Sequence, residues 1–558
     1  MENQPHKQQV TDLAHILKKQ GAKHVVMCPG SRNAPLMQVF HSDPAFTCHS
    51  IVDERSAGYV ALGMARETGE PVAVVTTSGT ATLNLAPAVA EAFFQQVPLV
   101  ILTADRPEEF PPQFTNQRIH QSEIYTGHVK AAFQLPADLD TRTTPDHVVR
   151  QMSAVIVQAT SGAHGPVHLN IPLEEPLYEP VAKKCSPAAE IFTRALPAGH
   201  EAVLTQEDKV LIDRAIRERK KVLIVAGVHR YSDGEIAMLT GLTQNYEVAV
   251  IAENLANLPA DQFVVMPELL LAGAEPAGLR GLLPDLVITT GGAVVSKRTR
   301  LFVQGLKNVP VIATGSLPGT LFREIPGADP ESEHSMNQYL SAWKTLEKAA
   351  LERSAVFFRD AAFSNLSACR TILENLPKGS SVHLGNSATV RYSQLLPVRS
   401  GLTYYSNRGT SGIDGSLSTA VGAAMVSDRQ HVVIMGDLSF VYDSNGMWNA
   451  GFPDNLKVVV LNDHGGGIFR LLDGPGHMSF FEEFSVTNHP VDLQLLVRAF
   501  GLDYRQAKDI ASLQKGLREL FTGMEHPGVL EVDTAGSENS FIFKQFFKFL
   551  QYQENGKT

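Results

Sequence analysis

The sequence predicts an α/β protein of three doubly wound domains with mainly parallel sheets, in which the first and third domains are related to each other. Three observations support this fold class. The chain has 558 residues and a mass of 60.7 kDa, which corresponds to about three domains. Short apolar runs of strand length alternate with helical segments along the chain, as in parallel α/β sheets. The sequence also overlays itself almost without gaps when it is shifted by 359 positions.

Each copy of this internal repeat contains a small-residue helix, a strand, a second helix and a second strand. This order is that of a doubly wound unit with parallel strands. Any two α/β units look alike at this level of detail, but here the register holds from the first helix to the last strand. The paired segments are 61–65 with 420–424, 72–77 with 431–436, and 99–102 with 458–461, so that Ser78 falls on Asp437.

The first domain is expected to span residues 1–180. Its elements are a helix over 9–20, a strand over 24–28, a turn over 29–32, a helix over 56–66 and a closing strand over 166–171. The segment 178–199 contains several prolines and mixed charges without a clean period. This composition favours a linker that crosses the surface.

A middle domain is expected over residues 200–345 and a third domain over 360–550. The middle domain has predicted strands at 221–226, 247–251 and 286–290, and a helix over 331–358 crosses to the third domain. In the third domain the apolar runs 431–436 and 457–461 predict strands, and residues 551–558 are expected to fray.

Bulk composition excludes several classes of protein. The net charge is −10 and no Lys/Arg block stands out, which argues against nucleic acid as a partner. No apolar run approaches the ~18 residues of a membrane span, and the polar start is not that of a signal peptide. The four cysteines are scattered, so they imply neither a zinc site nor a disulfide framework. A cytoplasmic enzyme is the expectation.

Two aspartates follow predicted strands of the third domain. Asp437 comes after the strand 431–436, and Asp463, 26 residues later, precedes the glycines 465–467. Two oxygen ligands at the tips of neighbouring parallel strands suit a hard cation, and Mg²⁺ usually accompanies a phosphorylated partner. Glycines let the backbone approach that partner closely. The pattern therefore predicts a diphosphate cofactor held through Mg²⁺.

Glu54 has two interpretations. An acid in the first turn of a helix complements the helix dipole, which contributes roughly 0.3–1 kcal/mol. Alternatively, thiamine diphosphate needs a carboxylic acid against one nitrogen of its aminopyrimidine ring. Beside a repeat-related magnesium site the second interpretation is stronger, because Glu54 and Asp437 would then hold opposite ends of one cofactor.

Further short blocks occur in a fixed order along the whole chain. They are Pro29-Gly30-Ser31-Arg32, Asp53-Glu54-Arg55, Thr77-Ser78-Gly79-Thr80, Thr103-Ala104-Asp105-Arg106-Pro107, Asn116-Gln117, Lys297-Arg298, Gly385-Asn386-Ser387, Ser406-Asn407-Arg408-Gly409 and Gly436-Asp437-Leu438-Ser439. With these blocks the chain resembles the thiamine-diphosphate-dependent enzymes of the acetohydroxyacid synthase and pyruvate decarboxylase group. Within that group it is most similar to the MenD family of menaquinone biosynthesis, the 2-succinyl-5-enolpyruvyl-6-hydroxy-3-cyclohexene-1-carboxylate synthases.

The resemblance implies a cofactor site and a metal site. It implies Mg²⁺, for which Mn²⁺ can substitute, on Asp437, Asp463 and the backbone carbonyl of Gly465. It implies thiamine diphosphate on Glu54, Asn386, Ser387, Ile413, Leu438 and Ser439, with Ile413 holding the cofactor bent. Two positions depart from the broader group: Leu438 replaces a glycine, which MenD proteins share, and Asp463 stands where asparagine is usual.

The resemblance also implies the substrate site. Each substrate carries two carboxylates, and arginine pairs bidentately with such groups. The implied substrate residues are Ser31, Arg32, Arg106, Gln117, Lys297, Arg298, Arg391, Arg408 and, as an apolar wall, Phe469. Of the implied residues, Glu54, Gln117, Arg32, Arg391 and Ser387 are expected to act in catalysis.

The implied reaction is the decarboxylation of 2-oxoglutarate followed by 1,4-addition of the resulting succinyl carbanion to isochorismate. A homodimer is the implied minimum assembly and a homotetramer is expected. Another carboligase or decarboxylase of the group, such as an acetolactate synthase-like or oxalyl-CoA decarboxylase-like enzyme, is the main alternative. A nucleotide-binding regulatory protein is the second alternative, since the run 222–227 is similar to a nucleotide-binding strand and turn. That motif is weak without a G-x-G-x-x-G fingerprint.

Overall fold

The computed structural model describes the chain except for residues 1–4, 108–115, 137–143, 183, 193–203, 316–336, 450, 472–473, 523–526, 536 and 552–558. The chain divides into two compact units. Unit 1 contains residues 1–200, 407–431 and 439–456, and unit 2 contains residues 201–406, 432–438 and 457–558. The two units are described separately below.

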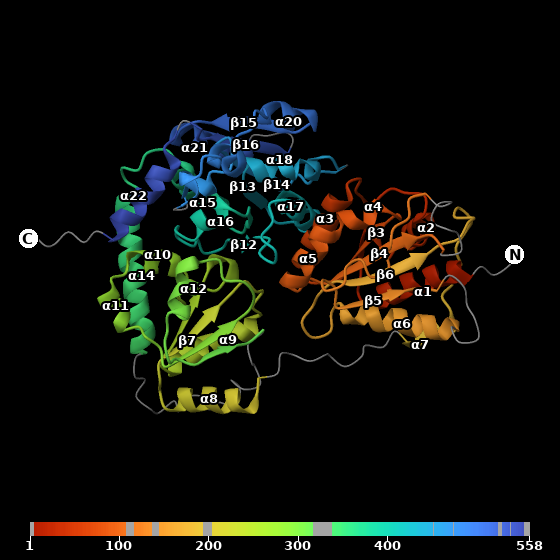
Figure 1. The fold of residues 1–558 in the computed structure, drawn as a ribbon, viewed down its shortest axis with the longest axis horizontal. Coiled ribbons are helices and arrows are strands. Elements are labelled where there is room, and N and C mark those ends of the chain that lie inside the picture. The colour runs from red at the N-terminus through yellow and green to blue at the C-terminus, as the bar shows by residue number, and fades with distance from the viewer. Residues whose placement is uncertain are drawn as a thin grey trace, which may run out of the picture. The chain divides into compact units, whose positions relative to one another are not determined.

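The sheet of unit 1 has six parallel strands in the order β2-β1-β3-β4-β6-β5. Figure 1 labels β3, β4, β5 and β6 of this sheet. The strands are β1 (His24–Met27), β2 (Thr47–Ser50), β3 (Val72–Thr76), β4 (Leu99–Asp105), β5 (Ala131–Gln134) and β6 (Val167–Pro172). The central strands β3, β4 and β6 are buried along their whole length. Burial along the whole length is typical of parallel strands that are covered on both faces.

Helices cover both faces of this sheet. One layer, α1 (Pro5–Lys19), α2 (Ala34–Ser42) and α6 (Pro145–Gln158), shares a core with alternate residues of the strands, including Leu13, Leu36, Met152, Val75 and Leu102. The other layer is formed by α3 (Glu54–Thr68), α4 (Thr80–Asn84) and α5 (Ala86–Gln95). Helix α17 (Ser416–Met425), from the third predicted domain, packs on α3.

Unit 2 contains two parallel sheets. The four-stranded sheet has the order β10-β9-β7-β8, and the six-stranded sheet has the order β12-β11-β13-β14-β16-β15. The strands of the smaller sheet are β7 (Val222–Ala226), β8 (Val248–Ala252), β9 (Leu286–Thr290) and β10 (Val311–Ala313). Those of the larger sheet are β11 (Ser381–Leu384), β12 (Thr403–Tyr405), β13 (His431–Gly436), β14 (Leu456–Asn462), β15 (Asp503–Ala507) and β16 (Gly528–Asp533).

Helices surround both sheets of unit 2 (Figure 1). Around the smaller sheet they are α8 (Gln206–Arg217), α9 (Asp233–Asn245), α10 (Pro267–Gly273), α11 (Pro276–Arg280), α12 (Lys297–Gln304) and α14 (Gln338–Phe357). The later ones are α15 (Asn365–Asn375), α16 (Ala388–Ser393), α19 (Ile468–Leu471), α20 (Leu493–Ala499), α21 (Ile510–Thr522) and α22 (Asn539–Gln551). Helix α18 (Asp437–Tyr442) begins in unit 2, and its residues from Ser439 onward belong to unit 1. One continuous apolar core joins the two sheets, and it includes Ile224, Ile288, Val382, Val459 and Leu530.

The two six-stranded sheets have the same strand order, and this identity confirms the predicted internal repeat. In the order of the chain, each sheet runs second, first, third, fourth, sixth and fifth strand. The predicted fold class of doubly wound, mainly parallel sheets is therefore correct. The predicted strand 286–290 coincides with β9, and most other predicted strands agree within one residue at each end.

Two predictions of local structure are wrong. The helix that follows Asp53 begins at Glu54 rather than at Ser56, because Asp53 is the N-cap and its Oδ1 accepts the backbone N–H of Arg55 at 2.9 Å. The expected linker over 178–199 contains a helix, α7 (Pro187–Phe192). It forms because Ala188 and Ala189 are buried in the core of unit 1.

Parts of other predictions fall outside the described residues. The helix expected over 331–358 is α14, and residues 331–336 lie outside the part that the structure describes. The segment expected to fray is 551–558. Residues 552–558 also lie outside the described part, and Gln551 is the last residue of α22. Among the described residues, no helix combines the length and apolar character needed to cross a membrane.

Candidate active site

Glu54 is the first residue of α3 and is half-buried. Burial, and to a lesser degree the neighbouring charge of Asp53, raises the pKa of its carboxyl group, while a backbone hydrogen bond opposes the shift. Asp53 is itself held from outside α3, because Asn445 Nδ2 donates to Asp53 Oδ2 at 2.8 Å. The helix start is therefore fixed, and it presents an acid that holds its proton more tightly than an exposed glutamate.

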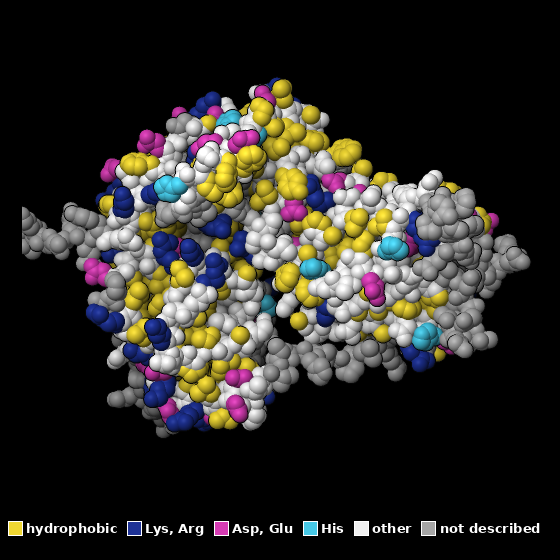
Figure 2. Space-filling view, viewed as in Figure 1, with side chains coloured by type: hydrophobic (Ala, Val, Ile, Leu, Met, Phe, Trp, Pro, Cys, Tyr) yellow, Lys and Arg dark blue, Asp and Glu magenta, His cyan; other side chains and the backbone are white. Residues whose placement is uncertain are grey.

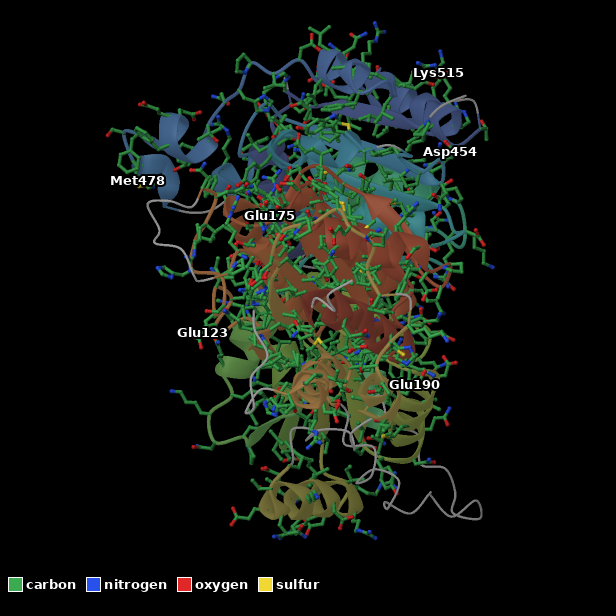
Figure 3. All side chains as sticks on the ribbon, turned by 90° about the vertical axis from the view of Figure 1, so that its right-hand side faces the viewer. Glu123, Glu175, Glu190, Asp454, Met478 and Lys515 are labelled. Atoms are coloured by element: carbon green, nitrogen blue, oxygen red, sulfur yellow. The ribbon has the colours of Figure 1, made fainter. Side chains whose placement is uncertain are left out.

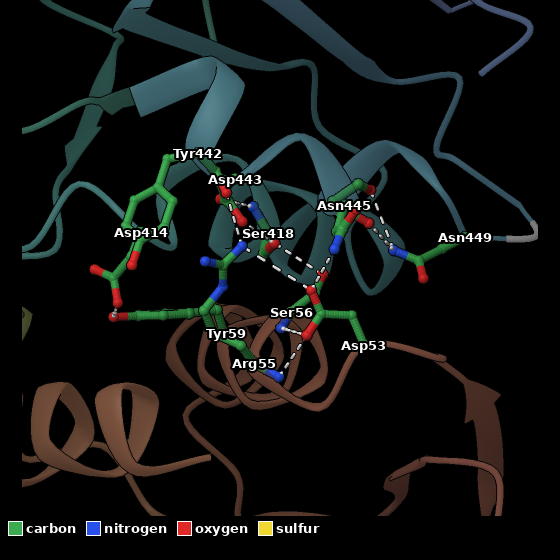
Figure 4. Close-up of polar contacts among 11 residues, drawn as sticks. Asp53, Arg55, Ser56, Tyr59, Asp414, Ser418, Tyr442, Asp443, Asn445 and Asn449 are labelled. Atoms are coloured by element: carbon green, nitrogen blue, oxygen red, sulfur yellow. Dashed lines mark hydrogen bonds and ion pairs between the residues drawn. The ribbon is translucent and has the colours of Figure 1, made fainter. Parts of the chain in front are cut away.

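A polar network joins the first turn of α3 to the first turn of α17 (Figure 4). Ser56 Oγ lies 2.9 Å from Ser418 Oγ. Ser418 donates twice to Asp443, from its backbone N at 2.8 Å and from its Oγ at 2.6 Å. Because Ser418 Oγ donates its single hydroxyl proton to Asp443, Ser56 is the donor in the Ser56–Ser418 contact.

Ile413 lies in the segment that leads into α17. Its carbonyl oxygen accepts from Ser439 Oγ at 2.9 Å. The next residue, Asp414, accepts from the hydroxyl of Tyr59 on α3 at 3.1 Å (Figure 4). Glu54 and Ile413 are also separated by the repeat distance of 359 residues, so they occupy equivalent positions in the two copies. Ser439, expected to contact the cofactor, thus has a second role in holding Ile413.

Arg32 and Arg106 form a buried cationic group in unit 1. Arg32 Nη1 donates to the carbonyl of Leu173 at 2.8 Å, and Nη2 lies 3.3 Å from Glu175, which is labelled in Figure 3. Burial, and then the charge of Arg106, lowers the pKa of Arg32. The Nε atoms of both arginines are buried and have no hydrogen-bond partner among the described residues. Two close guanidinium groups with spare donors suit a carboxylate ligand.

Gln117 lies against the glycine turn that follows β3. It has a positive φ of 58°, and a Cβ at Gly79 would come within 2.9 Å of its Cγ. Gln121, which belongs to no sequence motif, is 1% exposed and accepts the backbone N–H of Gly79 at 2.8 Å. A single glutamine carries no sequence signal, so only the fold reveals this role. Ser31 is exposed in the turn before α2.

The two predicted metal-binding aspartates come together in unit 2. Asp437 is 2% exposed. Burial raises the pKa of its carboxyl group, and hydrogen bonds from the N–H groups of Leu438 and Gly465 only partly oppose this shift. Burial, and then the charge of Asp437, raises the pKa of Asp463 to about 7. Two buried carboxylates that repel each other in this way form a donor set that fits a divalent cation.

The glycine loop after β14 packs closely around these acids. A Cβ at Gly467 would lie 2.0 Å from Asp463 Oδ2, so this position has no room for a side chain. The carbonyl of Gly465, the expected third ligand, accepts from the N–H of Gly467 at 3.0 Å. Phe469, at the start of α19, is 39% exposed.

Two residues that were not predicted contact the acids. His489 Nε2 lies 3.0 Å from Asp437 Oδ2. Asn365 Nδ2 donates to Asp463 Oδ2 at 3.2 Å. Both belong to segments without a motif, and each lies far from its partner in sequence, so the strand pattern could not indicate them.

Cations of the middle and third predicted domains gather in unit 2. Lys297 and Arg298 begin α12, and Arg298 forms an ion pair with Glu268. Burial, and then the charge of Arg300, lowers the pKa of Arg391 on α16, while Glu268 raises it. Figure 2 shows Lys and Arg side chains over the region of α12 and α16. The structure thus adds Glu268 and Arg300 to the predicted group.

The remaining predicted residues lie at the ends of strands and at helix starts. Asn386 is 2% exposed and accepts from Ser406 Oγ at 3.4 Å. Ser387 has a φ of 73°, and its carbonyl accepts from Arg391. Leu438 is partly buried and follows Asp437 directly. Arg408 belongs to unit 1 and is also partly buried.

The predicted residues fall into two sets. Unit 1 holds Ser31, Arg32, Glu54, Arg106, Gln117, Arg408, Ile413 and Ser439, and unit 2 holds Lys297, Arg298, Asn386, Ser387, Arg391, Asp437, Leu438, Asp463, Gly465 and Phe469.

Comparison with known proteins identifies two domain families in the chain. Residues 9–124 match the thiamine pyrophosphate enzyme N-terminal TPP binding domain, and residues 385–533 match the C-terminal TPP binding domain. The first match contains Glu54, and the second contains Asp437 and Asp463.

Curated relatives named 2-succinyl-5-enolpyruvyl-6-hydroxy-3-cyclohexene-1-carboxylate synthase match along nearly the whole chain. The relative from Desulfotalea psychrophila is 39% identical over 544 residues, which cover 94% of this chain and 98% of the relative. Those from Flavobacterium johnsoniae and Cytophaga hutchinsonii are 33% and 34% identical, with coverage of 96% and 98% of this chain and 98% and 99% of the relatives.

Proposed function

Because the chain belongs to the 2-succinyl-5-enolpyruvyl-6-hydroxy-3-cyclohexene-1-carboxylate synthase family, we propose that it catalyses the reaction named for that family in menaquinone biosynthesis. It decarboxylates 2-oxoglutarate and adds the succinyl unit to isochorismate in a 1,4-addition. The observation that carries this proposal is the similarity over nearly the full length to relatives of that name. The two TPP binding domains support thiamine diphosphate as the cofactor.

The residues of the site fit this cofactor. Asp437, Asp463 and the carbonyl of Gly465 would hold Mg²⁺ or Mn²⁺, since two buried, mutually repelling carboxylates need a compensating cation. Glu54 would contact the aminopyrimidine ring, supported by the raised pKa that lets its carboxyl share a proton with a ring nitrogen. The cofactor, when bound, supplies a carbon nucleophile and an acceptor for the electron pair left when carbon dioxide departs.

Other side chains would shape and bind the same cofactor. Ile413, fixed by Ser439, would press against it and keep it bent. The remaining proposed cofactor residues are Asn386, Ser387 and Leu438.

The cationic residues would bind the carboxylates of the two substrates. Arg32 and Arg106 offer buried guanidinium donors in unit 1, and Arg391 with Lys297 and Arg298 offers a second cationic group in unit 2. A guanidinium that is already desolvated binds a carboxylate more strongly than an exposed one. Ser31, Gln117, Ser387, Arg408 and Phe469 complete the proposed substrate site.

The assembly and the domain boundaries belong to this proposal too. We propose a homodimer as the minimum assembly, with a homotetramer expected, in the cytoplasm. Each chain would contain three domains, over residues 1–180, 200–345 and 360–550. Cofactor that bridges subunits should stabilise the assembly by ~2.7 kcal/mol at a hundredfold excess over its dissociation constant.

Titration calorimetry with thiamine diphosphate tests this proposal. We expect binding in the presence of Mg²⁺, loss of most binding in a chelator, and a rise in Tm with added cofactor. Binding that is absent with Mg²⁺ would contradict the cofactor assignment. If saturating cofactor changed neither the Tm nor the oligomeric state, this would contradict a cofactor site shared between two subunits.

A further inference from the structure

Three buried glutamates of this protein bind pairs of consecutive backbone N–H groups. Glu91 accepts from Gly409 and Thr410 at 2.7 and 2.6 Å. Glu253 accepts from Val295 and Ser296 at 2.8 and 2.6 Å. Glu347 accepts from Val265 and Met266 at 2.7 and 2.9 Å. Their exposures are 0%, 3% and 6%.

Two of these three pairs lie directly beside cations of the proposed substrate site. Gly409 follows Arg408, and Ser296 precedes Lys297 and Arg298. The pair held by Glu347, Val265 and Met266, leads into α10, which carries Glu268, the ion-pair partner of Arg298. The same arrangement therefore occurs twice directly beside these cations and once two residues before an acid that binds one of them.

We propose that Glu91 and Glu253 are positioning residues, which fix the backbone of the two loops that carry the substrate-binding cations. The inference rests on the proposed function, because it assigns the cations to substrate carboxylates. A carboxylate that accepts from two adjacent N–H groups forms charge-assisted hydrogen bonds, which are stronger than neutral ones. A loop fixed before binding loses less entropy when substrate arrives.

In unit 1 the Arg408 loop lies directly on α5. Thr410 Oγ1 also donates to Glu91 at 2.6 Å, so three donors of the loop converge on one carboxylate. A Cβ at Gly409 would lie 2.7 Å from the carbonyl oxygen of Glu91. The backbone of the loop therefore packs directly against the backbone of α5. The hydrogen bonds to Glu91 fix the position of Gly409, the residue that follows Arg408. Further along the same segment Ile413 is held by Ser439.

In unit 2 Glu253 follows β8 and holds the two residues before α12. Glu268 adds a second hold, since it accepts from Ser296 Oγ at 2.5 Å and from the backbone N of Arg298 at 3.3 Å. The two acids act on different atoms. Glu253 accepts from backbone N–H groups of the loop, whereas Glu268 pairs with the guanidinium of Arg298. Because Glu268 contacts a proposed substrate-binding cation directly, Glu253 is the residue chosen for the test.

A glutamate-to-glutamine exchange breaks this arrangement without changing its size. Glutamine has one oxygen to accept a hydrogen bond, and its NH₂ group would face the second backbone N–H as another donor. One buried N–H then lacks an acceptor, which loosens the loop. Glu247→Gln is the control, because Glu247 accepts from the consecutive backbone N–H groups of Gln338 and Tyr339 at 3.3 and 2.8 Å, at the start of α14 and not beside these cations.

The experiment compares wild type with Glu91→Gln, Glu253→Gln and Glu247→Gln. Steady-state kinetics give kcat and KM for 2-oxoglutarate and isochorismate, and hydrogen exchange reports the amides 409–410 and 295–296. We expect Glu91→Gln and Glu253→Gln to raise the KM of at least one substrate roughly tenfold or more, with a smaller change in kcat. Exchange should accelerate at the released amides. Glu247→Gln should leave both KM values within about twofold of wild type.

Thr410→Val provides a milder test if Glu91→Gln does not fold, since it removes only the Oγ1 contact with Glu91. It should raise KM in the same direction and by less. Equal KM values for Glu91→Gln, Glu253→Gln and Glu247→Gln, in the presence of wild-type turnover, would overturn the positioning role alone. A rise in KM with unchanged exchange at these amides would also overturn it. A wild-type protein that turns over neither acid would instead overturn the proposed function, and the positioning role with it.

Discussion

Gly63 and Gly422 occupy equivalent positions of the internal repeat, 359 residues apart, and each lies against the backbone of the helix that carries the other. A Cβ at Gly63 would be 2.0 Å from the carbonyl oxygen of Thr419, and a Cβ at Gly422 would be 1.9 Å from that of Val60. Helices α3 and α17 can approach this closely only because both positions lack a side chain. The contact holds the helix of Glu54 against the segment that carries Ile413.

Gly63→Ala and Gly422→Ala should both destabilise unit 1. The added methyl group must push two helix backbones apart, and overpacking of this kind costs about 1–3 kcal/mol or more. Chemical denaturation measures the change in the free energy of unfolding. Gly241→Ala is the control, since Gly241 lies within α9 and its Cβ would meet no atom within 4 Å. That change should be neutral or stabilising by up to about 1 kcal/mol. Equal stability of the Gly63 and Gly241 variants would contradict the packing described here.

Glu54→Gln should fold normally and lose most carboligation, because an amide cannot exchange a proton with the cofactor ring. Removal of an acid–base group of this kind lowers rates by roughly 10²–10⁴-fold. Turnover is compared with that of Glu70→Gln, which changes an exposed acid that pairs with Lys23 just after α3. Glu70→Gln should keep wild-type rates. Wild-type rates in Glu54→Gln would remove the assigned role of this carboxyl group.

Asp463→Asn should retain activity at saturating Mg²⁺ but bind the metal more weakly. The exchange removes one of two buried like charges, and affinity at such sites depends on the charge of the ligands, so a roughly tenfold weaker Kd is expected. For the same reason the metal-free protein should become more stable. Metal titration and unfolding in a chelator measure the two effects. A folded but inactive variant would show that the charge of Asp463 is needed for more than metal affinity.

The stability of unit 1 should depend on the protonation of Asp443. Complete burial raises the pKa of this carboxyl from 3.8 to about 7. Between these values the unfolded chain has lost the proton and the folded protein still holds it. The free energy of unfolding contributed by Asp443 therefore falls as pH rises from about 4 to 7, by roughly 1.4 kcal/mol per pH unit.

Urea unfolding of wild type and Asp443→Asn from pH 5 to pH 7.5 isolates this contribution. Asparagine keeps one acceptor for the N–H of Ser418 and does not titrate. The variant should gain stability relative to wild type as pH rises. A difference between the two proteins that does not change with pH would show that Asp443 remains ionised throughout the range. Charges near this carboxyl include Arg55, which lowers its pKa.

The sheets and the repeat could be predicted from the sequence, because parallel strands buried on both faces appear in it as continuous apolar runs such as Val222–Ala226. The acids that follow β13 and β14 could be recognised in the same way. Strand β2 could not, because its residues Thr47–Ser50 carry no apolar pattern. Helix α7 does carry a sequence signal, since Ser186 followed by Pro187 is a typical helix start.

The contacts that hold the site could not be predicted in the same way. His489 reaches Asp437, Gln121 reaches Gly79, and Glu91 reaches Gly409 from segments with no motif of their own. These pairs depend on tertiary packing between distant parts of the chain. Sequence patterns therefore indicated the groups with a chemical role, and the structure adds the residues that hold them in place.

The most direct test of the proposed activity is carbon dioxide release from 2-oxoglutarate with Mg²⁺ and thiamine diphosphate, in the presence and absence of isochorismate, with the product identified by mass spectrometry. We expect release coupled to formation of a succinyl adduct of isochorismate. Release from pyruvate but not from 2-oxoglutarate, with no such adduct, would contradict the proposed function and assign the protein a different 2-oxo acid chemistry.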